Sequence, residues 1–220
     1  ECWIPGNHIA EQIGIQDSAE SGYRYLSRLA LGYNDDRMTL NYAVNARAAL
    51  KWFEEKIGLT MLVIEGCPDY YFRHNNDAIG HGRMLECEPF DGATLGEWQE
   101  KTRVSHLTPY GMMHPEFYGR GGSCNMANWD YGPMAERLMQ DQRCLGSGLA
   151  AYFVKGALDR GVGLHVGFEV QELIGDGSLV VGVGGVDSAL GADDLLHVGG
   201  GAVEGDVQPG GFGGRGGDTG

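Results

Sequence analysis

The segment that most constrains the fold is NDDRMTLNYAVNARAALKWFEEKIG, residues 34–58. Apolar side chains recur in it at the i, i+4, i+7 and i+8 spacing that places them on one face of an α-helix. Gly58 follows at the position where a glycine commonly ends a helix. The next run, LTMLVIE, is short, apolar and β-branched, which is typical of a buried strand. A long amphipathic helix followed by a buried strand predicts an α/β protein. The apolar positions of the helix are Tyr42, Ala46, Ala49, Leu50, Phe53 and Ile57.

Three further segments carry helix signals. DSAESGYRYLSRLAL opens on Asp17 with Glu20 three residues later, a spacing that predicts a capping box. PMAERLMQ favours a short helix after a proline. GSGLAAYFVKGALDRG has an apolar helical stripe and ends at Gly161, so it predicts a helix over residues 146–161.

Strand signals gather in the second half of the chain. VGLHVGFEV, residues 162–170, alternates strictly between apolar and other residues, which predicts a half-buried strand. ELIGDGSLVVGV then predicts a β-hairpin with Asp176 and Gly177 at its turn.

Composition divides the chain into regions. Residues 73–140 are rich in Gly, Pro, Asn, Met and aromatic residues with little periodicity, which favours an irregular, pocket-forming region. Residues 184–220 are glycine-rich with few large apolar side chains, and glycine loses the most backbone entropy on ordering. We therefore expect one folded region over residues 1–183 and a loosely ordered tail over 184–220.

The charge excludes some partners. The 220 residues carry a formal net charge of −14, whereas nucleic acids and anionic membranes attract clustered Lys and Arg. No run approaches the roughly 20 apolar residues of a membrane span. The five cysteines are scattered without a C-x-x-C pair, which favours reduced thiols and a cytoplasmic location. The sequence leaves the oligomeric state open.

Two local patterns suggest other sites. Gly146, Gly148 and Ala151 match G-x-G-x-x-A, and Glu169 follows about twenty residues on, as in nicotinamide-binding Rossmann proteins. The preceding stretch RLMQDQRCL is polar and helix-like, so the strand that this motif requires is missing. The second pattern is a set of metal-ligating residue types with no tight ligand spacing, and we predict no metal site from it. Its members are His74, Asp77, His81 and Cys87.

Several segments, taken in order, resemble the FAD-dependent 3-ketosteroid Δ1-dehydrogenases and the wider fumarate reductase/succinate dehydrogenase flavoprotein group. The resemblance covers roughly residues 2–183. Its segments are CWIPGNHIAEQIGIQDSAESGYRYL, YAVNARAALKWFEEKIGL, CPDYYF, GRMLECEPFDGATLGEW and GLAAYFVKGALDRGVGLHVGFEVQELIGDGSLVVGV.

The resemblance implies a fold and a cofactor. The fold would be the central part of an FAD-binding, Rossmann-like domain of the glutathione-reductase type, incomplete here, with helical and irregular insertions and a β-hairpin. FAD would lie beside Trp3, Ile4, Pro5, Gly6 and Asn7, with its adenine at the backbone of Val170. The nucleotide-binding loop of the family would lie before Glu1, and its second lobe would lie beyond the other end.

The resemblance also implies an activity. Tyr70 of CPDYYF falls on a catalytic-site tyrosine, whose phenol lies in the substrate pocket and assists a second tyrosine that abstracts a proton. Tyr71 would belong to the substrate pocket or pack beside it. The reaction would remove a proton next to the ketone of a small apolar, steroid-like substrate and pass a hydride to flavin N5. The alternatives are a nicotinamide-dependent dehydrogenase and a catalytically inactive fragment.

Overall fold

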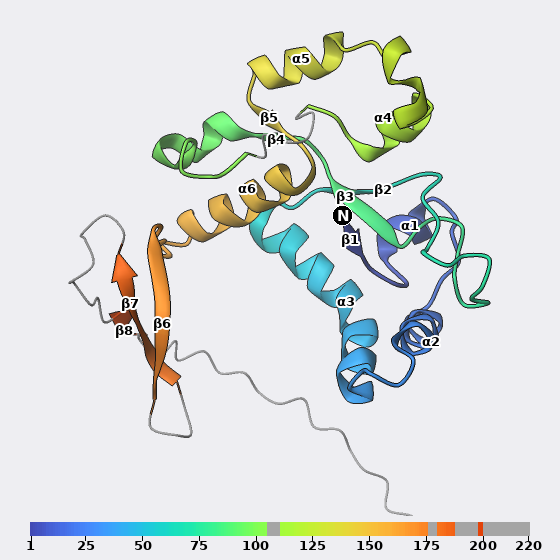
Figure 1. Ribbon diagram of the computed structural model, residues 1–220, viewed down its shortest axis with the longest axis horizontal. Coiled ribbons are helices and arrows are strands. Elements are labelled where there is room, and N and C mark those ends of the chain that lie inside the picture. The colour runs from blue at the N-terminus through green and yellow to red at the C-terminus, as the bar shows by residue number, and fades with distance from the viewer. Residues whose placement is uncertain (105–110, 176–179, 188–197, 200–220) are drawn as a thin grey trace, which may run out of the picture. The chain divides into compact units, whose positions relative to one another are not determined.

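The computed structural model describes residues 1–104, 111–175, 180–187 and 198–199 (Figure 1). The chain divides into two compact units, Glu1–Leu164 and His165–Gly220, each with its own sheet or sheets. Most of the predicted tail, 184–220, lies outside the described residues. The helices are α1 His8–Gln12, α2 Ala19–Ala30, α3 Asp36–Ile57, η1 Gly92–Trp98, α4 His114–Gly119, η2 Ser123–Asn128, α5 Gly132–Met139 and α6 Leu145–Leu158, where η marks a 3₁₀-helix.

The strands form three small sheets. In the first unit, β1 (Cys2–Trp3), β3 (Met84–Cys87) and β2 (Met61–Val63) lie side by side in that order, and β4 (Phe90–Asp91) pairs with β5 (Gln142–Arg143). In the second unit, β7 (Val180–Asp187) lies between β6 (Phe168–Gly175) and β8 (Val198–Gly199). Every strand pair among the described residues is antiparallel.

These elements make a mixed α/β protein with small antiparallel sheets, which confirms the coarser prediction of fold class. The strand predicted from LTMLVIE is β2. The finer assignment, an incomplete Rossmann-like FAD domain, stays a prediction, because the described strands form no parallel sheet.

The main core of the first unit lies between α3, α6 and the three-stranded sheet in which β3 is the central strand. Helix α3 begins after Asp35, whose side chain accepts from the Met38 amide, and ends at Gly58 with a φ of 66°. The end at Gly58 agrees with the sequence prediction, and the acidic N-cap at Asp35 is a common helix start that the sequence analysis did not name. The core residues are Ile4, Ala10, Ala46, Leu50, Leu59, Met61, Val63, Leu85 and Cys87, with Leu149 and Tyr152 of α6 packed against them.

Helix α2 lies alongside α3 (Figure 1), but its N-cap differs from the prediction. Ser18 caps the helix by accepting from the Ser21 amide. Asp17 makes no capping box, because its carboxylate accepts from Arg83 and from the Gly6 amide instead. A buried guanidinium is the stronger donor, so tertiary structure overrides the local capping signal.

Helix α6 confirms the helix predicted over residues 146–161, and it explains one glycine of the G-x-G-x-x-A pattern. A Cβ on Gly148 would lie 2.3 Å from the Arg143 carbonyl oxygen. A Cβ on Gly146 would have no heavy atom within 4 Å. Gly148 is therefore required by close backbone packing inside this unit.

We expect Gly148→Ala to lower the free energy of unfolding by about 1–3 kcal/mol, because the added methyl overpacks the backbone of β5. Gly146→Ala is the matched control in the same helix, and it should raise that free energy by up to about 1 kcal/mol, as alanine favours helix. Urea unfolding of both variants measures the difference. Equal midpoints would contradict the packing role of Gly148.

The second unit confirms the hairpin, although its predicted turn at Asp176 and Gly177 lies outside the described residues. The strand predicted over residues 162–170 is confirmed for residues 168–170 and wrong for residues 162–167, because strand pairing begins only at Phe168. Val162 and Val166 are 50% and 57% exposed. Alternation buries one face of a strand only where a partner strand completes the sheet, and no described strand pairs with residues 162–167.

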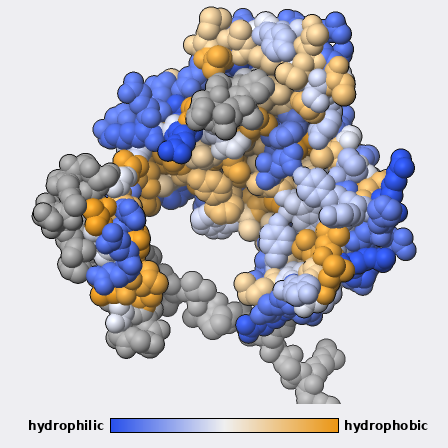
Figure 2. All heavy atoms as spheres, in the orientation of Figure 1, coloured by the Kyte–Doolittle hydropathy of each residue, from blue (hydrophilic) through white to orange (hydrophobic). Residues whose placement is uncertain are grey.

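The surface of both units carries apolar side chains. Figure 2 shows hydrophobic groups among the charged ones on the face it presents. Leu31 and Tyr33, just after α2, are 80% and 95% exposed. Among the described helices, none combines the length and the apolar character that crossing a membrane requires.

Candidate functional site

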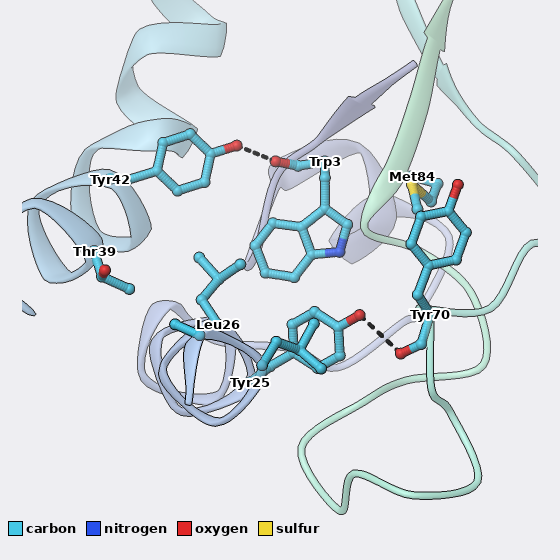
Figure 3. A pocket seen from close by; sticks show the side chains of 9 residues that line it. Trp3, Tyr25, Leu26, Thr39, Tyr42, Tyr70 and Met84 are labelled. Carbon is cyan, nitrogen blue, oxygen red and sulfur yellow. Dashed lines mark hydrogen bonds between the residues drawn. The ribbon is translucent and has the colours of Figure 1, made fainter. Parts of the chain in front are cut away.

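A cavity of about 550 Å³ lies in the first unit, within the size range of small-molecule pockets (Figure 3). Its walls come from β1, α2, α3, β3 and the loop that follows β2. Aromatic and aliphatic side chains dominate these walls, so the cavity suits an apolar ligand. The lining residues are Trp3, Tyr25, Leu26, Leu29, Ala30, Thr39, Tyr42, Tyr70 and Met84.

Trp3 stands at the centre of the cavity wall. Its ring stacks on Tyr25 with a centroid distance of 5.3 Å, and on Tyr42 at 6.5 Å. The Tyr42 hydroxyl donates to the Trp3 carbonyl oxygen (Figure 3). The indole Nε1–H donates to Asp69 at 2.7 Å. Stacking and hydrogen bonds together hold the indole in one orientation.

Arg83 lies beneath this wall with a fully buried side chain. It makes a two-pronged contact with Asp17 at 2.8 and 2.6 Å and a third bond to Asp69 at 2.8 Å. Its remaining N–H groups donate to the Asp77 carbonyl oxygen and the Ser21 hydroxyl. All five guanidinium donors thus have acceptors, which is what a buried arginine requires.

The same guanidinium touches the aromatic wall. Its Cζ lies 5.2 Å from the centroid of the Trp3 ring and 5.5 Å from that of Tyr25, within the range of cation–π contacts. The charged cluster and the cavity wall are therefore one packed unit.

Burial shapes the titration of two groups in this cluster. Burial, with a smaller effect of the Asp69 carboxylate, raises the pKa of Tyr25 to about 12. Its hydroxyl therefore stays protonated and donates to the Tyr70 carbonyl oxygen at 2.8 Å. Burial opposes ionisation of Asp17, but hydrogen bonds from Arg83 and the Gly6 amide outweigh it and lower the pKa of that carboxyl. Asp17 is thus a carboxylate at neutral pH.

The predicted cofactor residues Trp3–Asn7 lie at different depths. Trp3 lines the cavity, whereas Ile4, Pro5 and Asn7 are buried. Asn7 caps α1 by accepting from the Ala10 amide and donates to the carbonyl oxygens of Ile4 and Gly82.

Gly6 has a φ of +58°, and a Cβ there would lie 3.2–3.3 Å from the backbone at the start of α2. Its amide donates to Asp17, and its carbonyl oxygen accepts from Arg47. Together with the bonds of Asn7, these contacts give the segment a structural role, and its contact with FAD stays a prediction.

Of the two tyrosines predicted as site residues, only Tyr70 lines the cavity. Tyr70 lines the cavity and is 66% exposed. Tyr71 does not line it, is equally exposed, and has a φ of 59°. This left-handed conformation is costly for an aromatic residue, so the surrounding contacts must hold the loop in place. The catalytic role of Tyr70 and the pocket role of Tyr71 stay predictions.

The remaining predicted positions lie elsewhere. Val170 is on β6 in the second unit and is 52% exposed, and Glu169 precedes it there. Gly146 and Gly148 are at the start of α6 in the first unit. In the described part of the chain, no three His, Cys, Asp or Glu side chains gather closely enough to hold a metal ion.

The sequence analysis missed most of the cavity wall. Tyr25, Tyr42 and Met84 carry no motif, and of these only Tyr42 was named, as an apolar position of a helix. Asp69 and Arg83 also went unnoticed as partners. Buried charged residues must pair, but nothing in the sequence around Asp69 and Arg83 shows that they are buried.

Fold and cavity thus define a mixed α/β chain with an aromatic, apolar cavity. No protein-family profile matches the chain. It is 25% identical over 188 residues to 4-oxocyclohexanecarboxylate 2-dehydrogenase of Sinomonas cyclohexanicum, covering 82% of this chain and 32% of that protein.

A solved structure is also similar. The crystal structure of 3-ketosteroid Δ1-dehydrogenase from Sterolibacterium denitrificans in complex with 1,4-androstadiene-3,17-dione gives a TM-score of 0.72 at 23% identity. The match covers 90% of this chain and 38% of that one. The resemblance predicted from the sequence is therefore confirmed, and this chain corresponds to about a third of the length of each relative (32% and 38%).

Proposed function

We propose that the chain is part of an FAD-dependent oxidoreductase that dehydrogenates a carbon–carbon bond next to the ketone of a small apolar ring compound. The observation that carries this proposal is the meeting of Trp3 and Tyr70, which are distant in sequence, on one apolar cavity. The names of the relatives support it, because one acts on a cyclic ketone and the other is bound to a steroid diketone.

Tyr70 has the chemistry that this reaction needs. Removal of a proton next to a ketone builds negative charge on the ketone oxygen, and a hydrogen-bond donor at that oxygen stabilises the transition state. Tyr70 lines the cavity, and its carbonyl oxygen accepts a hydrogen bond from the Tyr25 hydroxyl. We assign to Tyr70 the role of holding the ketone and assisting proton transfer, with apolar neighbours orienting the ring system.

The residues that line the cavity fit the planar ring system of FAD better than its diphosphate. The face of Trp3 and the apolar wall suit a planar ring system, which stacks on aromatic side chains. The lining contains no Lys or Arg for a diphosphate, and the Gly6 amide already donates to Asp17. Trp3 would therefore hold the ring portion. When bound, FAD supplies the acceptor for the hydride.

The nicotinamide alternative gains no support from the described residues. Gly148 is accounted for by its contact with Arg143, and two-residue β5 takes the place of the long strand that the dinucleotide motif requires. Glu169 lies in the other unit.

The proposal is tested by purifying the full chain, adding FAD, removing free cofactor and recording the visible spectrum. We expect a retained flavin band that bleaches when a cyclic ketone with a saturated carbon–carbon bond next to its carbonyl group is added without oxygen. Androst-4-ene-3,17-dione and 4-oxocyclohexanecarboxylate are suitable ketones. A retained band that neither ketone bleaches would contradict the assigned reaction, and tight NADH binding without a flavin band would favour the nicotinamide alternative.

A further inference from the structure

Asp69 makes more contacts than a residue of an exposed loop needs. It is 3% exposed, and its carboxylate accepts three hydrogen bonds: one oxygen from Trp3 Nε1 at 2.7 Å, the other from Arg83 at 2.8 Å and the Ile79 amide at 3.0 Å. Its own amide donates to the Ile79 carbonyl oxygen at 3.0 Å. The side chain and the backbone of Asp69 are therefore both fixed.

These bonds close a ring of contacts around the cavity wall. Asp69 is joined by its peptide bond to Tyr70, whose carbonyl oxygen accepts from the Tyr25 hydroxyl. The Tyr25 ring stacks on Trp3 (Figure 3). The Trp3 indole N–H donates to Asp69, which completes the ring of contacts. A change at any member of this ring would shift the indole and the Tyr70 backbone relative to each other.

We propose that Asp69 is a positioning residue that fixes the Trp3 indole against Tyr70 and so sets how a ketone ring system lies in the cavity. This inference rests on the proposed function for the nature of the ligand. The left-handed φ of Tyr71 supports it, because a strained residue beside Tyr70 stays in place only if its neighbours are anchored. Asp69 provides that anchor on one side of Tyr70.

The two carboxylate oxygens of Asp69 have different partners, and this makes Asp69→Asn informative. An asparagine has one acceptor oxygen and one NH₂ group. The oxygen should take the place facing Arg83 and Ile79, which together present two donors. The NH₂ group then faces the indole N–H, and because both groups are hydrogen-bond donors, no hydrogen bond can form between them. The variant should thus release Trp3 while keeping the contact with Arg83.

Asp77→Asn is the matched control. Asp77 is close in sequence, its carboxylate accepts from Arg24, and its backbone carbonyl oxygen accepts from Arg83. The substitution removes the same charge but leaves the backbone bond and the indole contact unchanged.

The first measurement follows the indole N–H signals of the full chain by ¹⁵N NMR. The chain has four tryptophans, and Trp3→Phe identifies the signal of Trp3. In the unsubstituted protein, we expect this N–H to exchange with solvent far more slowly than that of Trp52, whose residue is 51% exposed. Asp69→Asn should move the Trp3 signal and speed its exchange, and Asp77→Asn should not.

The second measurement is the affinity for 1,4-androstadiene-3,17-dione, followed by the same signals. We expect Asp69→Asn to weaken binding about tenfold, as loss of a hydrogen bond to a charged group would, and Asp77→Asn to leave it unchanged. An unaltered Trp3 signal and affinity in Asp69→Asn would overturn the positioning role. If Asp69→Asn does not fold, rapid exchange of the Trp3 N–H in the unsubstituted protein would still overturn it.

The two proposals can fail separately. If the unsubstituted protein binds no ketone, the proposed function is wrong. If the unsubstituted protein binds no ketone but Asp69→Asn still moves the Trp3 N–H signal and speeds its exchange, Asp69 positions the indole even though the proposed function is wrong.

Discussion

Arg83→Met is expected to lower the free energy of unfolding by about 3–5 kcal/mol, the cost of breaking a buried ion pair from one side. The substitution leaves Asp17 and Asp69 buried together without their common partner, since the Arg83 side chain is fully enclosed. Such a loss is a large part of the 5–15 kcal/mol that is typical of whole domains. Chemical unfolding followed by far-UV circular dichroism measures it.

The difference in free energy of unfolding between the unsubstituted protein and Arg83→Met should become smaller at acidic pH. Asp17 has a lowered pKa in the folded protein, so its contribution is present above the unfolded value of about 3.8 and is lost as the pH falls through the lower folded value. In Arg83→Met, Asp17 loses the hydrogen bonds that lower its pKa, and burial, which raises that pKa, should let it bind a proton already in mild acid. The gap between the two proteins should therefore shrink as the pH is lowered from neutrality.

Arg47→Met serves as the control for Arg83→Met. Arg47 pairs with Glu11 at the surface, with side chains 40% and 60% exposed, and exposed pairs contribute little. Its loss of stability should be much smaller than that of Arg83→Met. Equal losses in the two variants, or a gap that is independent of pH, would contradict the account of a charged cluster that supports the cavity.

Tyr70→Phe is expected to lower turnover of a ketone substrate about 100-fold, because positioned acid–base groups typically contribute at least that factor. The fold should survive, since Tyr25 donates to the backbone of Tyr70 and not to its phenol. The phenyl ring also keeps its place in the cavity wall. Bound flavin should therefore change little, and the larger effect should fall on kcat, with a smaller rise in KM from the lost hydrogen bond to the ketone. Steady-state kinetics with an artificial electron acceptor measures both constants.

Tyr71→Phe is the control for this variant. Tyr71 is as exposed as Tyr70 but does not line the cavity. Its variant should retain turnover within a few-fold. If Tyr71→Phe lost more activity than Tyr70→Phe, the assignment of the two tyrosines would be reversed.

Local sequence patterns correctly predicted the helices and strands that are determined by residues close together in the chain. The long helix and its end at Gly58, the strand β2 and the hairpin of β6 and β7 follow from spacing, capping and turn residues that any short window contains. The resemblance to ketosteroid dehydrogenases depended on the order of such segments and was also found from sequence.

The errors arise where distant residues decide the structure. The local sequence predicts that Asp17 caps a helix, but in the structure its carboxylate accepts hydrogen bonds from Arg83, 66 positions later in the chain. The alternation of residues 162–170 reads as a strand, but a strand needs a partner at the right register. Tyr42 was predicted as an apolar position of its helix and Tyr25 was not singled out at all, and only the meeting of α2, α3 and β1 makes both of them walls of a cavity.

The most direct test of a ketone site at Tyr70 is a crystal structure of the full chain with 1,4-androstadiene-3,17-dione. The account predicts that the ring system lies in the cavity that Trp3 and Tyr70 line, with a ketone oxygen within about 3 Å of the Tyr70 hydroxyl, as a hydrogen bond requires. A steroid bound elsewhere, or in this cavity with both ketones turned away from Tyr70, would contradict it.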